Sequence, residues 1–316
     1  MQEDKTTLHT NPEAGLPLTE QDMNEQMRVR LGKLRELAAA GKDPFEEVTF
    51  PVTCHTSDIL ENFEAMEGQS VTVAGRLMSK RGMGKVSFCD LVDRRGRIQL
   101  FTKIDEIGED AYAEWQKLDI GDQGIAFRTQ RGEISVKTQS YKLLAKSLRP
   151  LPEKYHGLKD MDTRYRQRYL DLIVHPEVRD VFRKRSAIIS SVRKTLEDAG
   201  TLEVETPILS VLAGGANARP FKTFHNALGL DMYLRIATEL HLKRLVVGMF
   251  GRVYEIGRNF RNEGIDTMHN PEFTAMEVYW AYADVEDMMR LTEDIIRNAA
   301  DAVGAVIEWA SRLAED

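Results

Sequence analysis

Apolar residues recur at helical spacing in three long segments of the chain. The first begins at Thr19, which an aspartate follows three residues later as in a capping box, and its apolar positions continue until Gly41. The second begins at Pro176, a residue suited to the first turn of a helix, and closes at Gly200. The third covers residues 284–302. The spacing predicts an amphipathic α-helix in each segment.

Shorter segments alternate between apolar and polar residues, which is typical of β-strands. The predicted strands cover residues 71–77, 87–92, 97–101, 133–137, 141–145, 202–204, 232–236, 252–260 and 272–282. A further helix is predicted over residues 110–118, between the third and fourth strands. Strands grouped around one short helix, within about 80 residues, favour a small Greek-key barrel such as an OB-fold. A polar loop separates the last two strands, which predicts a long antiparallel hairpin.

The dipeptides Arg149-Pro150 and Leu151-Pro152 mark a domain boundary, because each proline removes a backbone donor and restricts the residue before it. A second domain follows this boundary. The predicted organisation is a flexible lead at 1–18, a helical region at 19–64, a barrel at 65–148, a linker at 149–160 and the second domain at 161–316.

Composition favours a folded protein without a uniformly basic surface. The 316 residues are 42% hydrophobic, which is ample for buried cores, and 50 acidic against 43 basic residues give a formal charge of -7. A local RNA-binding face is compatible with this charge, whereas a basic coat is not. Cys54 and Cys89 are too far apart in the sequence to suggest a zinc cluster or a redox pair, which favours a reducing compartment.

Neither the N-terminus nor any internal segment predicts export or membrane insertion. The first residues are polar and no apolar run follows them, unlike a secretory signal. The most apolar stretch, residues 242–249, is short and contains Lys243 and Arg244. We expect a cytoplasmic protein. The glycine-rich stretch 82–85 lacks the spacing of a phosphate-binding loop and predicts a hairpin turn instead.

The predicted hairpin carries the candidate chemistry. Arg261 and Glu263 are two residues apart and project to one side, while Phe273, Glu277 and Tyr279 share one face of the returning strand. If the two strands are in register, one surface combines a cation, carboxylates, a phenol and an aromatic ring. The alternative is a pair of solvent-exposed strands whose charges neutralise each other.

Several stretches resemble class II aminoacyl-tRNA synthetases. Residues 260–263, Phe-Arg-Asn-Glu, and residues 269–274, His-Asn-Pro-Glu-Phe-Thr, resemble motif 2 of that class. Residues 200–207, which follow the long helix, resemble motif 1, the dimer-interface element. The stretches 214–228 and 237–245 are similar to those of lysyl-tRNA synthetases in particular. The resemblance covers nearly all of the chain from about residue 25 to 300, in the order of the family.

This resemblance implies an α+β chain: a five-stranded OB-fold barrel that binds the anticodon, then a partial class II antiparallel-sheet catalytic domain. The implied activity is that of a lysine-tRNA ligase, which activates lysine with ATP and transfers it to tRNA(Lys). In the implied site Arg261 holds the ATP α-phosphate and the amino-acid carboxylate, a role suited to a planar and always charged guanidinium. Phe273 stacks on adenine, His269 and Asn270 position ATP, and Glu263 accepts hydrogen bonds near the base or the substrate amine.

For the amino acid, the resemblance implies that Gly215 and Glu239 meet the α-ammonium, and that Glu277 and Tyr279 lie near the lysine ε-ammonium. A buried cationic group needs a carboxylate and further acceptors in place of water, so neutral analogues would leave Glu277 unpaired. Pro207 is implied to lie at the interface of a homodimer.

In the barrel, the resemblance implies that Phe88 stacks on an anticodon base, that Gln99 and Glu133 read base edges, and that Arg76 supports the contact. Stacking and edge reading are the usual means of recognising single-stranded RNA. The residues alone leave a second interpretation open, in which Phe88 is a core aromatic of its strand.

The family's motif 3, its γ-phosphate arginine, its Mg²⁺-binding carboxylates and a second glutamate for the ε-ammonium have no counterpart in this sequence. We therefore expect ATP and Mg²⁺ as cofactors, with the metal ligands downstream of this chain, and an incomplete form of the ligase. One alternative is a non-catalytic fragment that binds tRNA(Lys) and dimerises. Another is a paralogue that modifies a protein lysine. Asparaginyl and aspartyl enzymes share the architecture, but Glu277 favours a cationic substrate.

Overall fold

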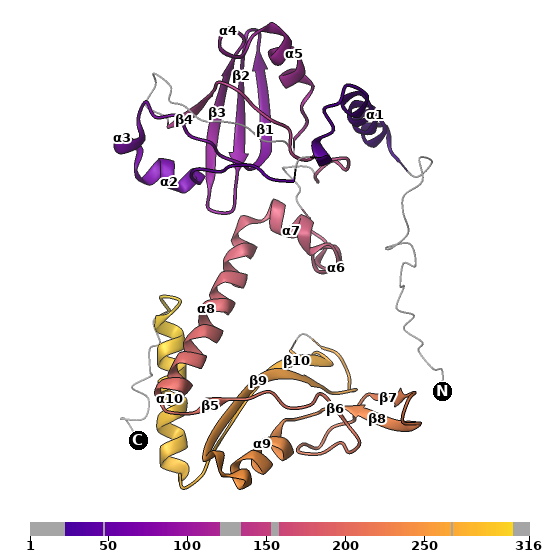
Figure 1. Ribbon diagram of the computed structural model, residues 1–316, viewed down its shortest axis with the longest axis vertical. Helices are drawn as coiled ribbons and strands as arrows, with labels where there is room; N and C mark the ends of the chain where they lie inside the picture. The colour runs from indigo at the N-terminus through magenta and orange to yellow at the C-terminus, as the bar shows by residue number, and fades with distance from the viewer. Residues whose placement is uncertain (1–22, 47, 121–133, 153–157, 267, 306–316) are drawn as a thin grey trace. The chain divides into compact units, whose positions relative to one another are not determined.

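The computed structural model describes residues 23–46, 48–120, 134–152, 158–266 and 268–305. They form two compact units, which divide between Leu170 and Asp171 and are described separately below (Figure 1). The described part of the chain contains no helix long and apolar enough to cross a membrane.

The first unit is built on a four-stranded sheet in the order β1-β2-β3-β4. The strands are β1 (Arg76–Met83), β2 (Val86–Val92), β3 (Arg97–Lys103) and β4 (Ser135–Thr138). The first three are antiparallel, whereas β4 runs parallel to β3. Gly84, with a φ of +62°, turns the chain between β1 and β2, which confirms the hairpin turn predicted there. Among the described residues the sheet has four strands and is not closed into the expected five-stranded barrel.

The helices of the first unit are short except for α1. They are α1 (Glu25–Ala39), the 3₁₀ turn η2 (Pro44–Glu46), α2 (Thr56–Glu61), α3 (Phe63–Met66), α4 (Ile104–Ile107), α5 (Glu109–Lys117) and α6 (Met161–Arg166), with α7 (Arg168–Val174) crossing the division. Helix α1 begins later than predicted, because the Asn24 side chain accepts the Met27 N–H at 2.9 Å and caps the helix there. The Thr19 capping box and the proposed flexible lead lie outside the described residues.

Two strand predictions in this unit are wrong. The first strand spans Arg76–Met83 instead of residues 71–77. Val71 and Val73 are buried in the core, so the apolar alternation there results from burial and not from strand pairing. Residues 141–145 are not a strand. The Tyr141 ring packs edge-on against Trp115 at 5.0 Å, and its hydroxyl donates to the Ala111 carbonyl at 3.1 Å. The apolar residues of that segment cover α5 instead of joining the sheet.

The core of the first unit lies on one face of the sheet. Inward-facing side chains of β1, β2 and β3 meet Trp115 and Tyr112 of α5, and Trp115 is fully buried. The opposite face of the strands does not pack against this core. It is therefore the face on which RNA-binding side chains can be exposed.

In the second unit, the long helix α8 (Pro176–Asp198) matches the predicted segment. It ends in a Schellman motif: Thr201 N–H donates to the Leu196 carbonyl at 3.0 Å and Gly200 N–H to the Glu197 carbonyl at 2.8 Å. Gly200 has a φ of +74°, which a residue without Cβ adopts at low cost.

The main sheet of the second unit has the order β10-β9-β5. Its strands are β9 (Arg252–Phe260), β10 (Glu272–Trp280) and the two-residue β5 (Leu202–Glu203), and a smaller sheet contains β6 (Leu209–Ser210), β8 (Leu230–Leu234) and β7 (Lys222–His225). The predicted antiparallel hairpin is confirmed, with Phe260 opposite Glu272. Strand β10 ends two residues early, since Tyr282 turns the chain with a φ of +64°.

Residue parity divides the hairpin into two faces. Even-numbered side chains, including the fully buried Tyr254, pack with Leu196 of α8 and Leu291 of α10 (Val285–Asp301), two helices that lie against each other (Figure 1). Asp284 and Asp287 form a capping box at the start of α10. The odd-numbered side chains project to the other face, where the candidate residues lie.

Candidate active site and RNA-binding face

The floor of the candidate site is the odd-numbered face of the β9–β10 hairpin. In the ladder Phe273 pairs with Asn259, and Glu277 pairs with Glu255. Directly opposite residues of an antiparallel pair share a face. The register therefore places Phe273, Glu277 and Tyr279 on one surface, as the sequence predicts.

Arg261 extends this surface just beyond the end of β9. Its backbone N–H donates to the Pro271 carbonyl at 2.8 Å, which continues the hairpin pairing by one residue. The guanidinium carbon is 5.0 Å from the Phe273 ring centroid, and Nε donates to the Ile236 carbonyl at 3.4 Å. The cation and the aromatic ring predicted to share a face are thus in contact.

Glu277 is held by neutral donors. The backbone N–H of Thr238 donates to its Oε1 at 3.2 Å, and the Tyr279 hydroxyl donates to its Oε2 at 3.2 Å. Burial and then the nearby charges of Glu277 and Glu239 raise the pKa of Tyr279. The phenol therefore stays protonated at neutral pH and remains a hydrogen-bond donor.

Gly215 lies directly against Glu239. Its φ is +88°, and a Cβ at this position would be 3.0 Å from the Glu239 Cβ and 3.2 Å from the Ala237 Cβ. Glu239 is the first residue of α9 (Glu239–Leu245), and its Oε1 pairs with the Lys243 Nζ at 2.6 Å. Lys243 Nζ is also 5.9 Å from the Tyr279 ring centroid. Gly215, Glu239, Glu277 and Tyr279 therefore belong to one neighbourhood.

A buried ion pair that the sequence does not predict supports this floor. Arg235 Nη1 and Glu255 Oε1 are 2.5 Å apart, and their side chains are only 4% and 5% exposed. Glu255 also accepts the Thr206 hydroxyl at 2.6 Å, while Arg235 donates to the Thr206 carbonyl at 3.0 Å and the Arg258 carbonyl at 2.8 Å. One sign of this pair was present in the sequence. Glu255 is a charged residue within the β9 alternation, on the odd-numbered face of the strand.

Two further buried polar atoms at the floor have no hydrogen-bond partner among the described residues. They are the hydroxyl oxygen of Thr238 and the side-chain carbonyl oxygen of Asn259, whose residues are 3% and 2% exposed. Such atoms are rare in native proteins and are available to a bound ligand or water. Neither residue was singled out from the sequence.

The remaining predicted ATP contacts lie in the exposed loop between β9 and β10. Glu263 Oε1 accepts the Arg219 N–H at 3.3 Å, and the His269 Nδ1 is 2.8 Å from Asp266 Oδ2. Hydrogen bonds from the Met268 N–H and then from His269 lower the pKa of Asp266. Asn270 is exposed beside them. The described residues 262–266 and 268–270 of this loop are exposed to solvent, and Glu263, Asp266 and His269 are held by these hydrogen bonds.

Pro207, the predicted interface residue, is exposed and directly follows Thr206 of the buried network. The preceding segment is tied to β9, because Val204 N–H donates to the Tyr254 carbonyl at 2.9 Å.

In the first unit, the predicted anticodon residues Arg76, Phe88 and Gln99 lie on the sheet face opposite the core. Phe88 faces away from the buried side chains. Its ring centroid lies 5.0 Å from that of Phe101, with the two rings tilted by 35°, and Phe101 is a residue that the sequence did not single out. Gln99 pairs in the ladder with Asp90.

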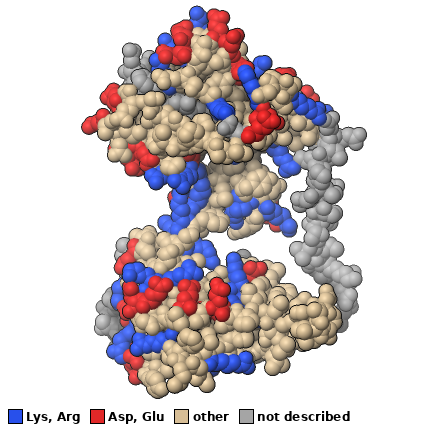
Figure 2. Space-filling view, viewed as in Figure 1, with Lys and Arg blue, Asp and Glu red and all other residues tan. Residues whose placement is uncertain are grey.

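Asp90 is itself paired with Arg97 at 2.8 Å. Lys and Arg are interspersed with Asp and Glu over the visible surface of the protein (Figure 2), in keeping with a local and not a uniform basic face. Glu133, the fourth predicted anticodon residue, lies outside the described residues.

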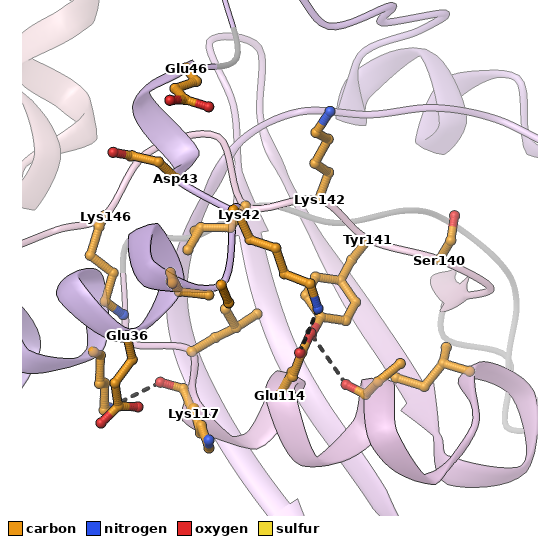
Figure 3. A pocket seen from close by; sticks show the side chains of 18 of the residues that line it. Glu36, Lys42, Asp43, Glu46, Glu114, Lys117, Ser140, Tyr141, Lys142 and Lys146 are labelled. Carbon is orange, nitrogen blue, oxygen red and sulfur yellow. Dashed lines mark hydrogen bonds and ion pairs between the residues drawn. The ribbon is translucent and has the colours of Figure 1, made fainter.

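A groove of about 740 Å³ lies between α1, α5 and the segment 139–146 (Figure 3). Lys42 pairs with Glu114 at 2.7 Å across it, and Lys146 Nζ is 2.6 Å from Asp119. None of the predicted site residues lines this groove.

Within the described residues, no group of three or more histidine, cysteine, aspartate or glutamate side chains could hold a metal ion.

Comparison with known proteins identifies both parts of the chain. Residues 160–313 match the model of the class II tRNA synthetases (D, K and N), and residues 71–144 match that of the OB-fold nucleic acid binding domain. A lysine-tRNA ligase of Clostridium perfringens (strain ATCC 13124) is 55% identical over 298 residues, which are 93% of this chain and 60% of the relative. A lysine-tRNA ligase of Clostridium botulinum (strain Langeland) is 57% identical over 288 residues, 90% of this chain and 57% of the relative.

The chain thus spans about three fifths of the length of the curated relatives that it matches. Both matched segments occur in the order expected from the sequence, and the hairpin with Arg261 lies inside the synthetase match. Residues 160–313 therefore form a domain of the class II tRNA synthetase family (D, K and N), and residues 71–144, which precede it, match an OB-fold nucleic acid binding domain.

Proposed function

We propose that this chain is the part of a lysine-tRNA ligase that recognises lysine, ATP and tRNA(Lys). The observation that carries the proposal is the charge arrangement on one face of the β9–β10 hairpin. Arg261 provides a guanidinium, while Glu239 and Glu277 provide carboxylates around the Tyr279 phenol. An amino acid with one carboxylate and two ammonium groups complements this set of charges.

In the proposed complex the substrate ε-ammonium meets Glu277 and Tyr279, and the α-ammonium meets Glu239 beside Gly215. Glu277 accepts hydrogen bonds from two neutral groups, the Thr238 N–H and the Tyr279 hydroxyl, so it keeps its capacity to pair with a cation. An analogue without the ε-ammonium would leave this carboxylate desolvated and unpaired, which is a strong basis for rejecting it.

The reaction proposed for the whole ligase begins when a lysine carboxylate oxygen attacks the α-phosphorus of ATP. A P–O bond forms to the carboxylate, the P–O bond to the leaving pyrophosphate breaks, and lysyl-adenylate results. A terminal ribose hydroxyl of tRNA(Lys) then attacks the acyl carbon and AMP leaves. Arg261 contributes by holding both oxyanions in line, which is catalysis by positioning and charge stabilisation.

The proposed ATP contacts extend from the sheet into the loop. Phe273, which already contacts the Arg261 cation, would stack on adenine, and Glu263, His269 and Asn270 would position the nucleotide from the exposed loop. Mg²⁺ would neutralise the phosphates when it is bound. In the part of the chain that the structure describes, no group of three or more histidine, cysteine, aspartate or glutamate side chains could hold this ion.

The proposed tRNA contact is the face of the first unit that carries Phe88, Phe101, Gln99 and Arg76. Two neighbouring aromatic rings bordered by polar side chains suit unpaired anticodon bases. We further propose that the four described strands belong to a five-stranded OB barrel, that the protein is cytoplasmic, and that Pro207 lies at a homodimer interface.

Lysine-dependent exchange of labelled pyrophosphate into ATP tests the catalytic proposal. In a form of the ligase with activity, Arg261→Ala should abolish this exchange, because the bridge between the carboxylate and the α-phosphate is lost. The matched control is Arg258→Ala, which removes an exposed arginine from the even-numbered face of the same strand and should leave exchange near the wild-type rate. Exchange by Arg261→Ala at the wild-type rate would contradict the role of Arg261.

A second candidate function is tRNA binding without catalysis. It is favoured by the first unit, whose Phe88 and Phe101 face lies outside its own hydrophobic core. In this case the 316-residue chain binds tRNA(Lys) in a salt-dependent manner and shows no lysine-dependent exchange. Phe88→Ala should weaken binding about 5- to 100-fold, the range expected for one stacked base. Phe45→Ala, which removes an exposed ring outside the sheet, should not.

A further inference from the structure

The proposed lysine pocket already contains an ammonium group of the protein. Lys243 Nζ lies 2.6 Å from Glu239 Oε1 and 5.9 Å from the centroid of the Tyr279 ring. Tyr279 in turn donates to Glu277. One lysine side chain of the protein is thus in contact with two of the groups that would bind the lysine substrate.

The two carboxylates of the pocket are held differently. Glu277 accepts hydrogen bonds from a backbone N–H and a phenol, both of them neutral. Glu239 is paired with a full positive charge on its Oε1, while its Oε2 would lie 3.7 Å from a Cβ at Gly215. A substrate ammonium can therefore approach Glu277 without displacing a charge, but at Glu239 it meets an ammonium that is already bound.

We infer that Lys243 is an internal counter-ion within the proposed lysine pocket, which a substrate ammonium displaces from Glu239 on binding. The inference rests on the proposed function, since it takes lysine as the ligand. Lys243 thus has a role that differs from that of Glu239, because it competes with the substrate ammonium instead of binding the substrate.

The geometry of α9 makes this exchange feasible. Glu239 and Lys243 are four residues apart on the helix, the spacing at which side chains meet on one surface. The Lys243 side chain is 58% exposed, so its ammonium can move into water when Glu239 is taken by another cation. The Glu239 side chain, at 30% exposed, is more constrained and stays at the pocket.

The competition predicts a definite change in affinity. Ion pairs this exposed are held by a free energy close to thermal energy, so Glu239 is free of Lys243 for roughly one sixth to one half of the time. The apparent affinity for the ligand falls to that fraction of its intrinsic value. Removing the internal cation should therefore tighten lysine binding by about two- to sixfold.

Calorimetric titration of lysine into the full 316-residue chain tests the inference with Lys243→Met. The matched control is Arg244→Met, which removes the same charge from the adjacent, exposed position of α9. Tighter binding by Lys243→Met, with Arg244→Met at the wild-type affinity, is the expected result. Equal or weaker binding by Lys243→Met overturns the inference, and so does an equal gain in both variants.

Two lysine analogues identify the ammonium that makes the exchange. Norleucine lacks the ε-ammonium, and 6-aminohexanoic acid lacks the α-ammonium. Norleucine should bind Lys243→Met more tightly than wild type, whereas 6-aminohexanoic acid should show no gain. A gain for both analogues would mean a general charge effect and would overturn the displacement. Lysine binding that is equal in all variants refutes only this inference, whereas no lysine binding by any variant refutes the proposed function as well.

Discussion

Replacing Glu255 by glutamine should strongly destabilise the second unit. Glu255→Gln keeps the size and shape of the side chain but removes the charge that faces Arg235. The two side chains are 5% and 4% exposed, so the guanidinium would remain buried without a counter-ion. Breaking a buried ion pair in this way costs about 3–5 kcal/mol, a large part of the stability of a single domain.

A second effect acts in the same direction. Both Glu255 oxygens accept hydrogen bonds, one from Arg235 and the other from the Thr206 hydroxyl. The glutamine amide group has an N–H donor in place of one of these acceptors. This buried N–H would then face either the Arg235 guanidinium or the Thr206 hydroxyl, each of which donates to Glu255. Relaxation of the neighbouring chain lowers this penalty, and the total stays within the range of about 3–5 kcal/mol.

Hydrogen exchange followed by mass spectrometry measures this loss locally in a chain with two units. The amides of β9 and β10 should lose about 10²- to 10³-fold of their protection or more, because 1.36 kcal/mol corresponds to a factor of ten. The amides of β1–β3, in the other unit, serve as an internal reference and should not change. Asp198→Asn, which breaks the exposed pair with Lys194, should leave all of them unaltered. A loss of less than about tenfold in β9 and β10 would refute the reasoning.

Three further perturbations test separate features. Burial by itself would raise the pKa of Asp93. Hydrogen bonds from the Thr56 N–H and hydroxyl, and from the backbone N–H groups of Arg95 and Gly96, lower this pKa below its usual value. Its stabilisation is therefore complete above the unfolded pKa of about 3.9 and is lost as the pH falls through the lower folded value, so Asp93→Asn should remove this acid-sensitive part in thermal melts between pH 2 and 6. Met249 is 92% exposed with a φ of +78°, so Met249→Gly should stabilise the second unit by about 0.5–1 kcal/mol in urea unfolding, whereas Val247→Gly should destabilise it by about 0.5 kcal/mol. Gly215→Ala should weaken lysine binding at least about tenfold in calorimetric titration without altering tRNA binding, because its Cβ would press on neighbouring Cβ atoms, and an unchanged lysine affinity would contradict the proposed pocket.

The parts predicted best from the sequence are those whose pattern is local. The β9–β10 hairpin was predicted because its alternation is long and its loop polar, and register then followed, with Phe273, Glu277 and Tyr279 on one face. The end of α8 was predicted because Gly200 has a specific backbone role there. Each signal lies within one continuous stretch of the sequence, so contacts between distant segments are not needed to detect it.

The parts predicted wrongly depend on contacts between distant segments. The alternation of residues 71–77 and 141–145 was interpreted as strand pairing, yet packing of Val71, Val73, Tyr141 and Leu143 against the core gives the same pattern without a ladder. The Arg235–Glu255 pair was missed for a related reason. Each charge alone resembles a surface residue, and only the fold brings together two side chains that are twenty positions apart.

Side chains of the β9–β10 hairpin project to one face or the other according to residue parity. This division determines where the chain can tolerate an insertion or a deletion. One residue inserted or deleted inside β9 or β10 would exchange the two faces beyond that point, so that Glu255 or Glu277 would turn toward α8 and α10 and apolar side chains would enter the site. The described residues of the connection between β9 and β10 carry no ladder pairs, so its length can vary without this exchange. Insertions and deletions among related genes should therefore accumulate in that connection and be excluded from the two nine-residue strands that flank it.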